Sequence, residues 1–141
     1  MASRRRARQR ALQILFLWDL HRSEPSDAIS QYYDTLYSEE QPQRDPFVAE
    51  LVQGTVEHLK ELDERISRHA EHWRMERMAA VDRNLLRAAV AEFLAFPETP
   101  RAVVINEALE IARKFSTPES VHFVNGVLDS VGKELGEATS G

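Results

Sequence analysis

The sequence predicts an all-α fold, a single-domain bundle of six to seven helices in two sub-bundles, and three observations support this. Apolar residues recur at helical spacing along most of the chain, and no segment alternates with the period of two that a half-buried strand requires. Prolines stand where helices would begin or end, and the connections between the periodic segments are short. The 141 residues are enough for one domain with its own core.

The first helix is expected from about Ser3 to about Ser23, where a Ser-Glu-Pro sequence ends it. Residues 11–20 are apolar on nearly all sides, which predicts a helix in the middle of the bundle, contacted from several directions. A second helix starts near Ser26 or Asp27, both of which are common N-cap residues. The polar segment SEEQPQRDP that follows is a predicted loop.

A long amphipathic stretch then covers residues 47–66. It forms one helix or two, with Gly54 and the Leu62-Asp63 region as the candidate interruptions. The segment HWRMERM connects it to the next element, and we expect the two sub-bundles to separate near residues 70–78.

Three signals near prolines define the remaining helices. Pro97 stops a helix that begins near Val81, and Pro100 suits the first position of the next one. The last helix starts either with Thr117 as N-cap before Pro118, or with a capping box between Ser116 and Glu119. Small polar residues predict a flexible tail at about 136–141 of a single domain spanning 1–141. The side chains expected to be buried together are Leu15, Trp18, Leu51, Leu86, Phe93, Ile111 and Val127.

The composition excludes several classes of protein. Because the chain has no cysteine, it has no disulfide framework, thiolate nucleophile or cysteine-based zinc site, and it fits a reducing cytoplasm. No apolar run approaches the roughly 20 residues that span a bilayer, so we expect a cytoplasmic protein with no membrane association. His58, His69 and His72 lack a further ligand at the spacing of a known metal motif. We therefore expect no metal, no cofactor and no catalytic residues.

Positive charge is concentrated at the N-terminus. The net charge is −5, yet five arginines fall within the first ten residues, so the rest of the chain carries −5 − 5 = −10. Cations in the first turns of a helix oppose its dipole at about 0.3–1 kcal/mol each, an arrangement that suits an external anion such as phosphate. A solvated basic face and a targeting signal are the alternatives. The predicted phosphate-binding residues are Arg4, Arg5, Arg6, Arg8 and Arg10.

Three segments of the chain resemble the NusB family. They are RRRARQRALQILFLWDL, WRMERMAAVDRNLLRAAVAEFLA and TPRAVVINEALEIARKFSTPESVHFVNGVLDSV, and the resemblance covers roughly residues 4–132. Its most specific pieces are INEA at Ile105 to Ala108 and FVNGVLD at Phe123 to Asp129. The resemblance implies a transcription antitermination factor that binds boxA single-stranded RNA together with the ribosomal protein NusE in rRNA operon transcription. Its further partners would be the other Nus factors on transcribing RNA polymerase.

The resemblance also implies roles for individual residues. Positions matching Phe16, His122, Phe123 and Asn125 lie on the RNA side in the family, although Phe16 also suits a core and Asn125 also suits a structural hydrogen bond. The pair Asp82-Arg83 matches a position linked to NusE, with an exposed ion pair as the alternative.

Two other interpretations of the whole chain remain. One is a helical protein-interaction module without RNA binding, which could form a homodimer. The other is a stand-alone relative of the NusB-like domain that precedes the catalytic domain in some RNA cytosine methyltransferases. The absence of a Gly-rich cofactor loop and of a cysteine nucleophile favours the stand-alone factor over an enzyme.

Overall fold

Seven α-helices and one short 3-10 helix build the described part of the chain, which in this computed structural model comprises residues 4–35, 44–71 and 73–140. No strand occurs within these ranges, so the predicted all-α fold is confirmed. None of the described helices is both long and apolar enough to cross a membrane. The elements are α1 (Arg4–His21), α2 (Pro25–Thr35), α3 (Pro46–Glu57), α4 (Leu59–His69), η1 (Met75–Arg77), α5 (Ala80–Ala95), α6 (Arg101–Phe115) and α7 (Pro118–Ser140).

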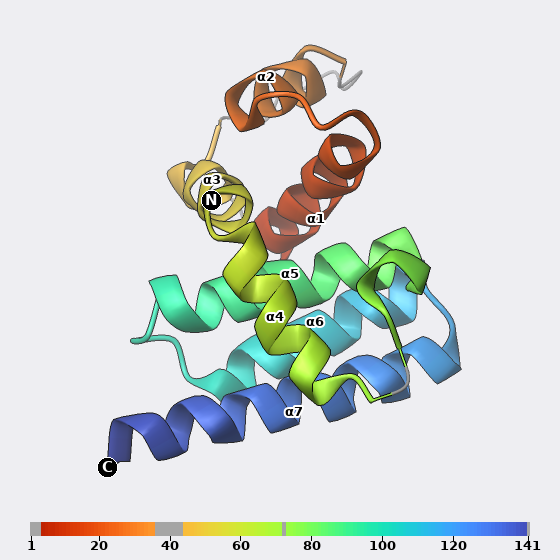
Figure 1. Ribbon diagram of the computed structural model, residues 1–141. Coiled ribbons are helices and arrows are strands. Elements are labelled where there is room, and N and C mark those ends of the chain that lie inside the picture. The colour runs from red at the N-terminus through yellow and green to blue at the C-terminus, as the bar shows by residue number, and fades with distance from the viewer. Residues whose placement is uncertain (1–3, 36–43, 72, 141) are drawn as a thin grey trace.

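The helices form two groups, with α1, α2 and α3 in one and α4 to α7 in the other (Figure 1). Helix α5 lies at the centre, because it packs against α1 and α3 on one side and against α4, α6 and α7 on the other. The first helix therefore does not occupy the middle, although α2, α3 and α5 contact it from several directions, as predicted. Leu17 and Leu20 of α1 are exposed to solvent, whereas α5 is buried on nearly all sides from Asn84 to Phe93.

The amphipathic stretch is two helices, and it breaks at His58. Neither predicted interruption is correct, since Gly54 lies within α3 and Leu62 within α4. The backbone N–H of His58 still donates to the Gly54 carbonyl, and Leu62 N–H donates to the His58 carbonyl, so the turn loses few hydrogen bonds. The two groups of helices separate at this turn, not near residues 70–78 (Figure 1).

Caps define several helix ends. Asp45 caps α3 by accepting a hydrogen bond from Phe47 N–H at 2.9 Å. Thr117 caps α7 by accepting from Ser120 N–H at 3.1 Å, with Pro118 as the first helical residue, as one of the two predicted starts requires. Helix α7 continues to Ser140, and both the predicted flexibility of the tail and the single domain over 1–141 stay predictions. Most of the predicted SEEQPQRDP loop lies outside the described residues.

All seven residues predicted to share the core are buried in one cluster. Trp18 is among them, and its indole N–H donates to the Ser23 carbonyl at 2.8 Å. The predicted core is confirmed.

An ionic network joins the two groups of helices. Asp19 of α1 accepts hydrogen bonds from Arg83 Nε at 2.8 Å and from Asn84 Nδ2 at 3.1 Å, both on α5. Arg87, one turn further along α5, binds Asp63 of α4 through two N–H groups at 2.8 and 2.9 Å. Burial alone would raise the pKa of Asp19, but the hydrogen bonds from Arg83, Asn84 and Arg22 outweigh it and hold this pKa at about 2.

Candidate nucleic-acid interface

The arginine-rich start of α1 is divided between internal and external roles. Arg8 is buried and binds Glu92 of α5 through two hydrogen bonds, at 2.8 and 2.6 Å. Only 9% of the Arg8 side chain and 2% of the Glu92 side chain are exposed. This bidentate pair leaves little of the Arg8 guanidinium for an external phosphate. The structure thus gives Arg8 a structural role, which differs from the phosphate-binding role predicted for it.

Arg5 has an intermediate position. Its guanidinium donates to both carboxylate oxygens of Glu107 on α6, at 2.6 and 3.0 Å, while about half of its side chain remains exposed. The hydrogen bond from Arg5 lowers the pKa of Glu107, and the same contact raises the pKa of Arg5. Arg5 and Arg8 thus pair with carboxylates of α6 and α5.

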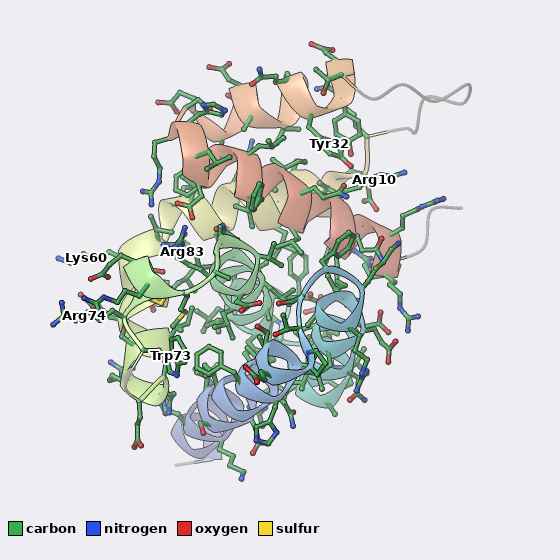
Figure 2. The ribbon with its side chains drawn as sticks, turned by 90° about the vertical axis from the view of Figure 1, so that its right-hand side faces the viewer. Arg10, Tyr32, Lys60, Trp73, Arg74 and Arg83 are labelled. Carbon is green, nitrogen blue, oxygen red and sulfur yellow. The ribbon has the colours of Figure 1, made fainter. Side chains whose placement is uncertain are left out.

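The other three arginines lie at the surface. Arg4 and Arg6 are exposed, and the Arg4 guanidinium lies 4.1 Å from the centre of the Phe47 ring. Arg10 is half-buried beside Tyr32 of α2 (Figure 2). A hollow of about 620 Å³ lies beside Arg4, and its lining also includes Arg5, Arg8, Phe47, Phe96 and Glu107. We call Arg4, Arg6 and Arg10 the cationic group.

The residues predicted to read bases lie elsewhere, at the start of α7. His122 and Asn125 are exposed, and Phe123 is half-buried. Asp82, in the first turn of α5, fixes this part of α7 by accepting a hydrogen bond from Ser120 Oγ at 2.7 Å. The Arg8 contact is with Glu92, ten residues further along α5, so about 15 Å of helix separates the two groups. The predicted phosphate-binding residues and the predicted base-reading residues of α7 therefore lie toward opposite ends of α5.

Phe16 belongs to neither group. It is half-buried on α1 and lines an apolar hollow of about 340 Å³ with Leu12, Leu17, Val81 and Phe115.

Asp82 and Arg83 are largely covered by the protein. Asp82 is 6% exposed and accepts hydrogen bonds from Ser116 Oγ and Ser120 Oγ, both at 2.7 Å. Besides binding Asp19, Arg83 donates to the carbonyls of Met75 and Met78, at 3.1 and 3.2 Å. The exposed ion pair considered as the alternative is therefore not what the structure has. A contact with NusE stays a prediction.

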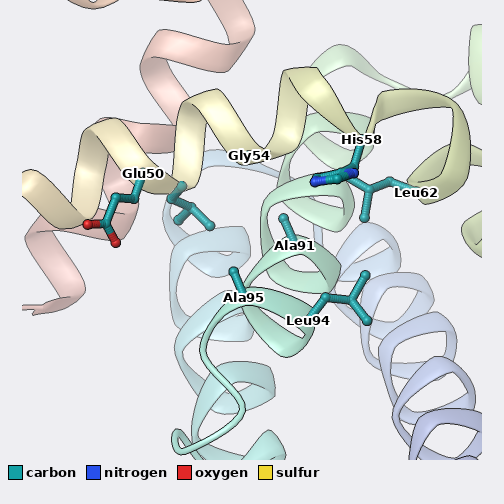
Figure 3. A pocket seen from close by; sticks show the side chains of 8 residues that line it. Glu50, Gly54, His58, Leu62, Ala91, Leu94 and Ala95 are labelled. Carbon is teal, nitrogen blue, oxygen red and sulfur yellow. The ribbon is translucent and has the colours of Figure 1, made fainter.

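A further hollow of about 130 Å³ lies at the break between α3 and α4 (Figure 3). Its lining is mainly apolar, from Leu51, Leu62, Ala91 and Leu94, and His58 is its only imidazole. No group of three or more potential metal-ligating side chains occurs among the residues that the structure describes, and His72 lies outside them.

The sequence analysis missed one aromatic side chain that contacts the start of α7. Trp73, in the connector before η1, is 54% exposed and packs on Phe123 with the ring centres 5.6 Å apart and the planes inclined at 53°. The signal was a tryptophan in a polar segment, HWRMERM, with no amphipathic helix to bury it.

These features define an all-helical binding protein, whose candidate site is a charged and aromatic surface. The NusB family model matches residues 5–133. The chain therefore belongs to the NusB family. A relative from Solibacter usitatus (strain Ellin6076), named transcription antitermination protein NusB, is 69% identical over 137 residues, which cover 97% of this chain and 93% of the relative.

Solved structures show the same fold. The structure of T. maritima NusB has a TM-score of 0.83 and 34% identity, with 94% of this chain and 92% of that chain covered. A crystal structure of antitermination factors NusB and NusE in complex with dsRNA has a TM-score of 0.79 and 27% identity, with 93% of this chain and 96% of that chain covered.

Proposed function

We propose that this protein is a transcription antitermination factor that binds RNA and carries no catalytic activity of its own. The observation that carries the proposal is the cationic group. Arg4, Arg6 and Arg10 lie in the first turns of α1, where the helix dipole disfavours positive charge, and the rest of the chain is acidic. A basic helix start of this kind suits the binding of phosphate groups. Membership of a family whose relatives are named antitermination proteins supports the same conclusion.

The proposed ligand is a single-stranded boxA-type RNA. Phosphates would bind the cationic group, and unpaired bases would contact Phe123 and Asn125 at the other end of α5. Because about 15 Å of α5 lies between the contacts at Glu92 and Asp82, the RNA would need several nucleotides to reach both groups.

The proposed protein partner is NusE. A relative of similar structure was solved as a complex of NusB, NusE and dsRNA. The acidic body of this chain complements a basic ribosomal protein. We propose that both ligands bind together in the cytoplasm, on transcribing RNA polymerase with other Nus factors during rRNA operon transcription.

A titration followed by fluorescence anisotropy tests the proposal. The probes are a labelled boxA-type RNA, a scrambled RNA of the same length and a duplex of the boxA-type sequence, each with and without NusE. Tightest binding of the single-stranded boxA-type RNA, strengthened by NusE, is the expected result. Preference for the duplex would contradict single-strand recognition. Binding of NusE with no RNA affinity would instead identify a protein-interaction module.

A further inference from the structure

We propose that Trp73 and Phe123 together form a stacking platform for one unpaired RNA base, with the exposed face of the Trp73 indole as the contact surface. This inference rests on the proposed function and adds a residue that neither sequence motifs nor family membership assigns. The Trp73 side chain is 54% exposed, although an indole of this size is usually buried. Its packing on Phe123, at 5.6 Å between ring centres, orients the ring while leaving much of it open.

The platform is held in place from α5. Arg83 donates hydrogen bonds to the carbonyls of Met75 and Met78, which fixes the connector that carries Trp73. Asp82 accepts from Ser120, which fixes the start of the helix that carries Phe123. The buried side chains of Ala70 and Met75 anchor the connector on both sides of Trp73. The two rings are thus positioned before a ligand arrives, so stacking would order few side chains.

Charge contributes little at this place. The exposed Arg74 and Arg77 are balanced by the exposed Glu71 and Glu76 in the same segment. Figure 2 shows Trp73 and Arg74 on one side of the molecule and Arg10 of the cationic group on another. Binding energy at Trp73 would therefore come from stacking, which every base permits and which salt screens little. This favours an unpaired base over the acidic or basic surface of a protein as the occupant.

Tryptophan fluorescence tests the inference directly, because the chain has only two tryptophans and Trp18 is 5% exposed. Titration of the full-length protein with a single-stranded boxA-type RNA should quench the Trp73 emission. In Trp73→Phe, which keeps an aromatic ring on Phe123, the RNA should still bind but the quenching should be absent. This variant remains informative even if Trp73→Ala fails to fold.

Anisotropy gives the energetic readout. Trp73→Ala should weaken RNA binding by about 5- to 150-fold, the range that corresponds to the loss of one stacked base. The salt dependence of binding should not change, since no phosphate contact is lost. An RNA with an abasic site at the stacked position should bind wild type and Trp73→Ala equally. The control variant is Leu94→Ala, which truncates an exposed apolar side chain on a different element, α5. It should leave RNA affinity unchanged.

The outcomes separate this inference from the proposed function. If wild type binds RNA but shows no quenching and Trp73→Ala retains full affinity, the stacking platform is wrong and RNA binding stands. If Trp73→Ala instead weakens only the binding of NusE, the exposed indole is a protein contact and the inference is overturned. If wild type binds none of the RNAs, both the proposed function and the platform fall.

Discussion

Removal of the Arg8 side chain should destabilise the fold and leave the RNA surface intact. Arg8 and Glu92 form a bidentate pair with 9% and 2% of their side chains exposed. Arg8→Ala would leave the Glu92 carboxylate buried without a counter-ion, which typically costs about 3–5 kcal/mol. For a domain of this size, 1 kcal/mol lowers the melting temperature by about 3 °C, so the expected decrease is about 10–15 °C.

A second variant separates stability from binding. The pair is flanked by Leu51, Val104 and Ile111 around a void of about 20 Å³. In such apolar surroundings, Arg8→Met combined with Glu92→Leu replaces both charges by apolar side chains of comparable volume and should restore stability to wild type or above. We expect this double variant to bind RNA with unchanged affinity and unchanged salt dependence.

Arg5→Ala is the matched control. It also breaks an arginine–glutamate pair, between α1 and α6, but half of the Arg5 side chain is exposed, so this variant should melt close to wild type. Thermal melts followed by circular dichroism, together with RNA anisotropy, provide both readouts. The structural role of Arg8 is refuted if Arg8→Ala melts within about 3 °C of wild type, or if the stable double variant loses RNA affinity.

Two further predictions concern stability. Because the pKa of Asp19 is about 2 when folded and lies near 3.8 in the unfolded chain, its contribution is fully present above about pH 4 and is lost as the pH falls toward 2. Urea unfolding between pH 2 and pH 5 should show Asp19→Asn losing less stability on acidification than wild type does; parallel curves for the two proteins would contradict this. Thr117→Ala removes the hydroxyl that caps α7 and should cost about 1 kcal/mol, whereas Thr117→Ser should retain most of it. Equal urea midpoints for Thr117→Ala and wild type would argue against the cap.

Local patterns predict the helices and the core well. Amphipathic spacing identifies the helical segments, and the proline after Thr117 indicates where α7 begins. The turn at His58 could not be found in this way, because no glycine or proline marks it and the apolar stripe continues through it. The chain changes direction there because α3 packs against α1 and α2, whereas α4 packs against α7.

The candidate site is harder to predict, because its residues are sorted by long-range contacts. Arg4 and Arg8 look equivalent in the sequence. In the structure Arg8 is buried in a pair with Glu92, 84 positions away, whereas Arg4 is exposed. Asp82 and Arg83 are likewise covered by partners from α1, η1 and α7 that no local spacing reveals. The contact of Trp73 with Phe123 of α7 is also long-range, and no local spacing reveals it.

The salt dependence of RNA binding tests the central claim most directly. The affinity of a boxA-type single-stranded RNA should be measured between about 50 and 200 mM salt for wild type and for the combined variant Arg4→Ala, Arg6→Ala and Arg10→Ala. Each phosphate neutralised on a single strand contributes about −0.7 to the slope of log affinity against log salt concentration. The three arginines of the cationic group therefore predict a slope shallower by about 2 in the variant, with weaker binding at every salt concentration. An unchanged slope and affinity in the folded variant would contradict the claim that this end of α1 binds the RNA backbone.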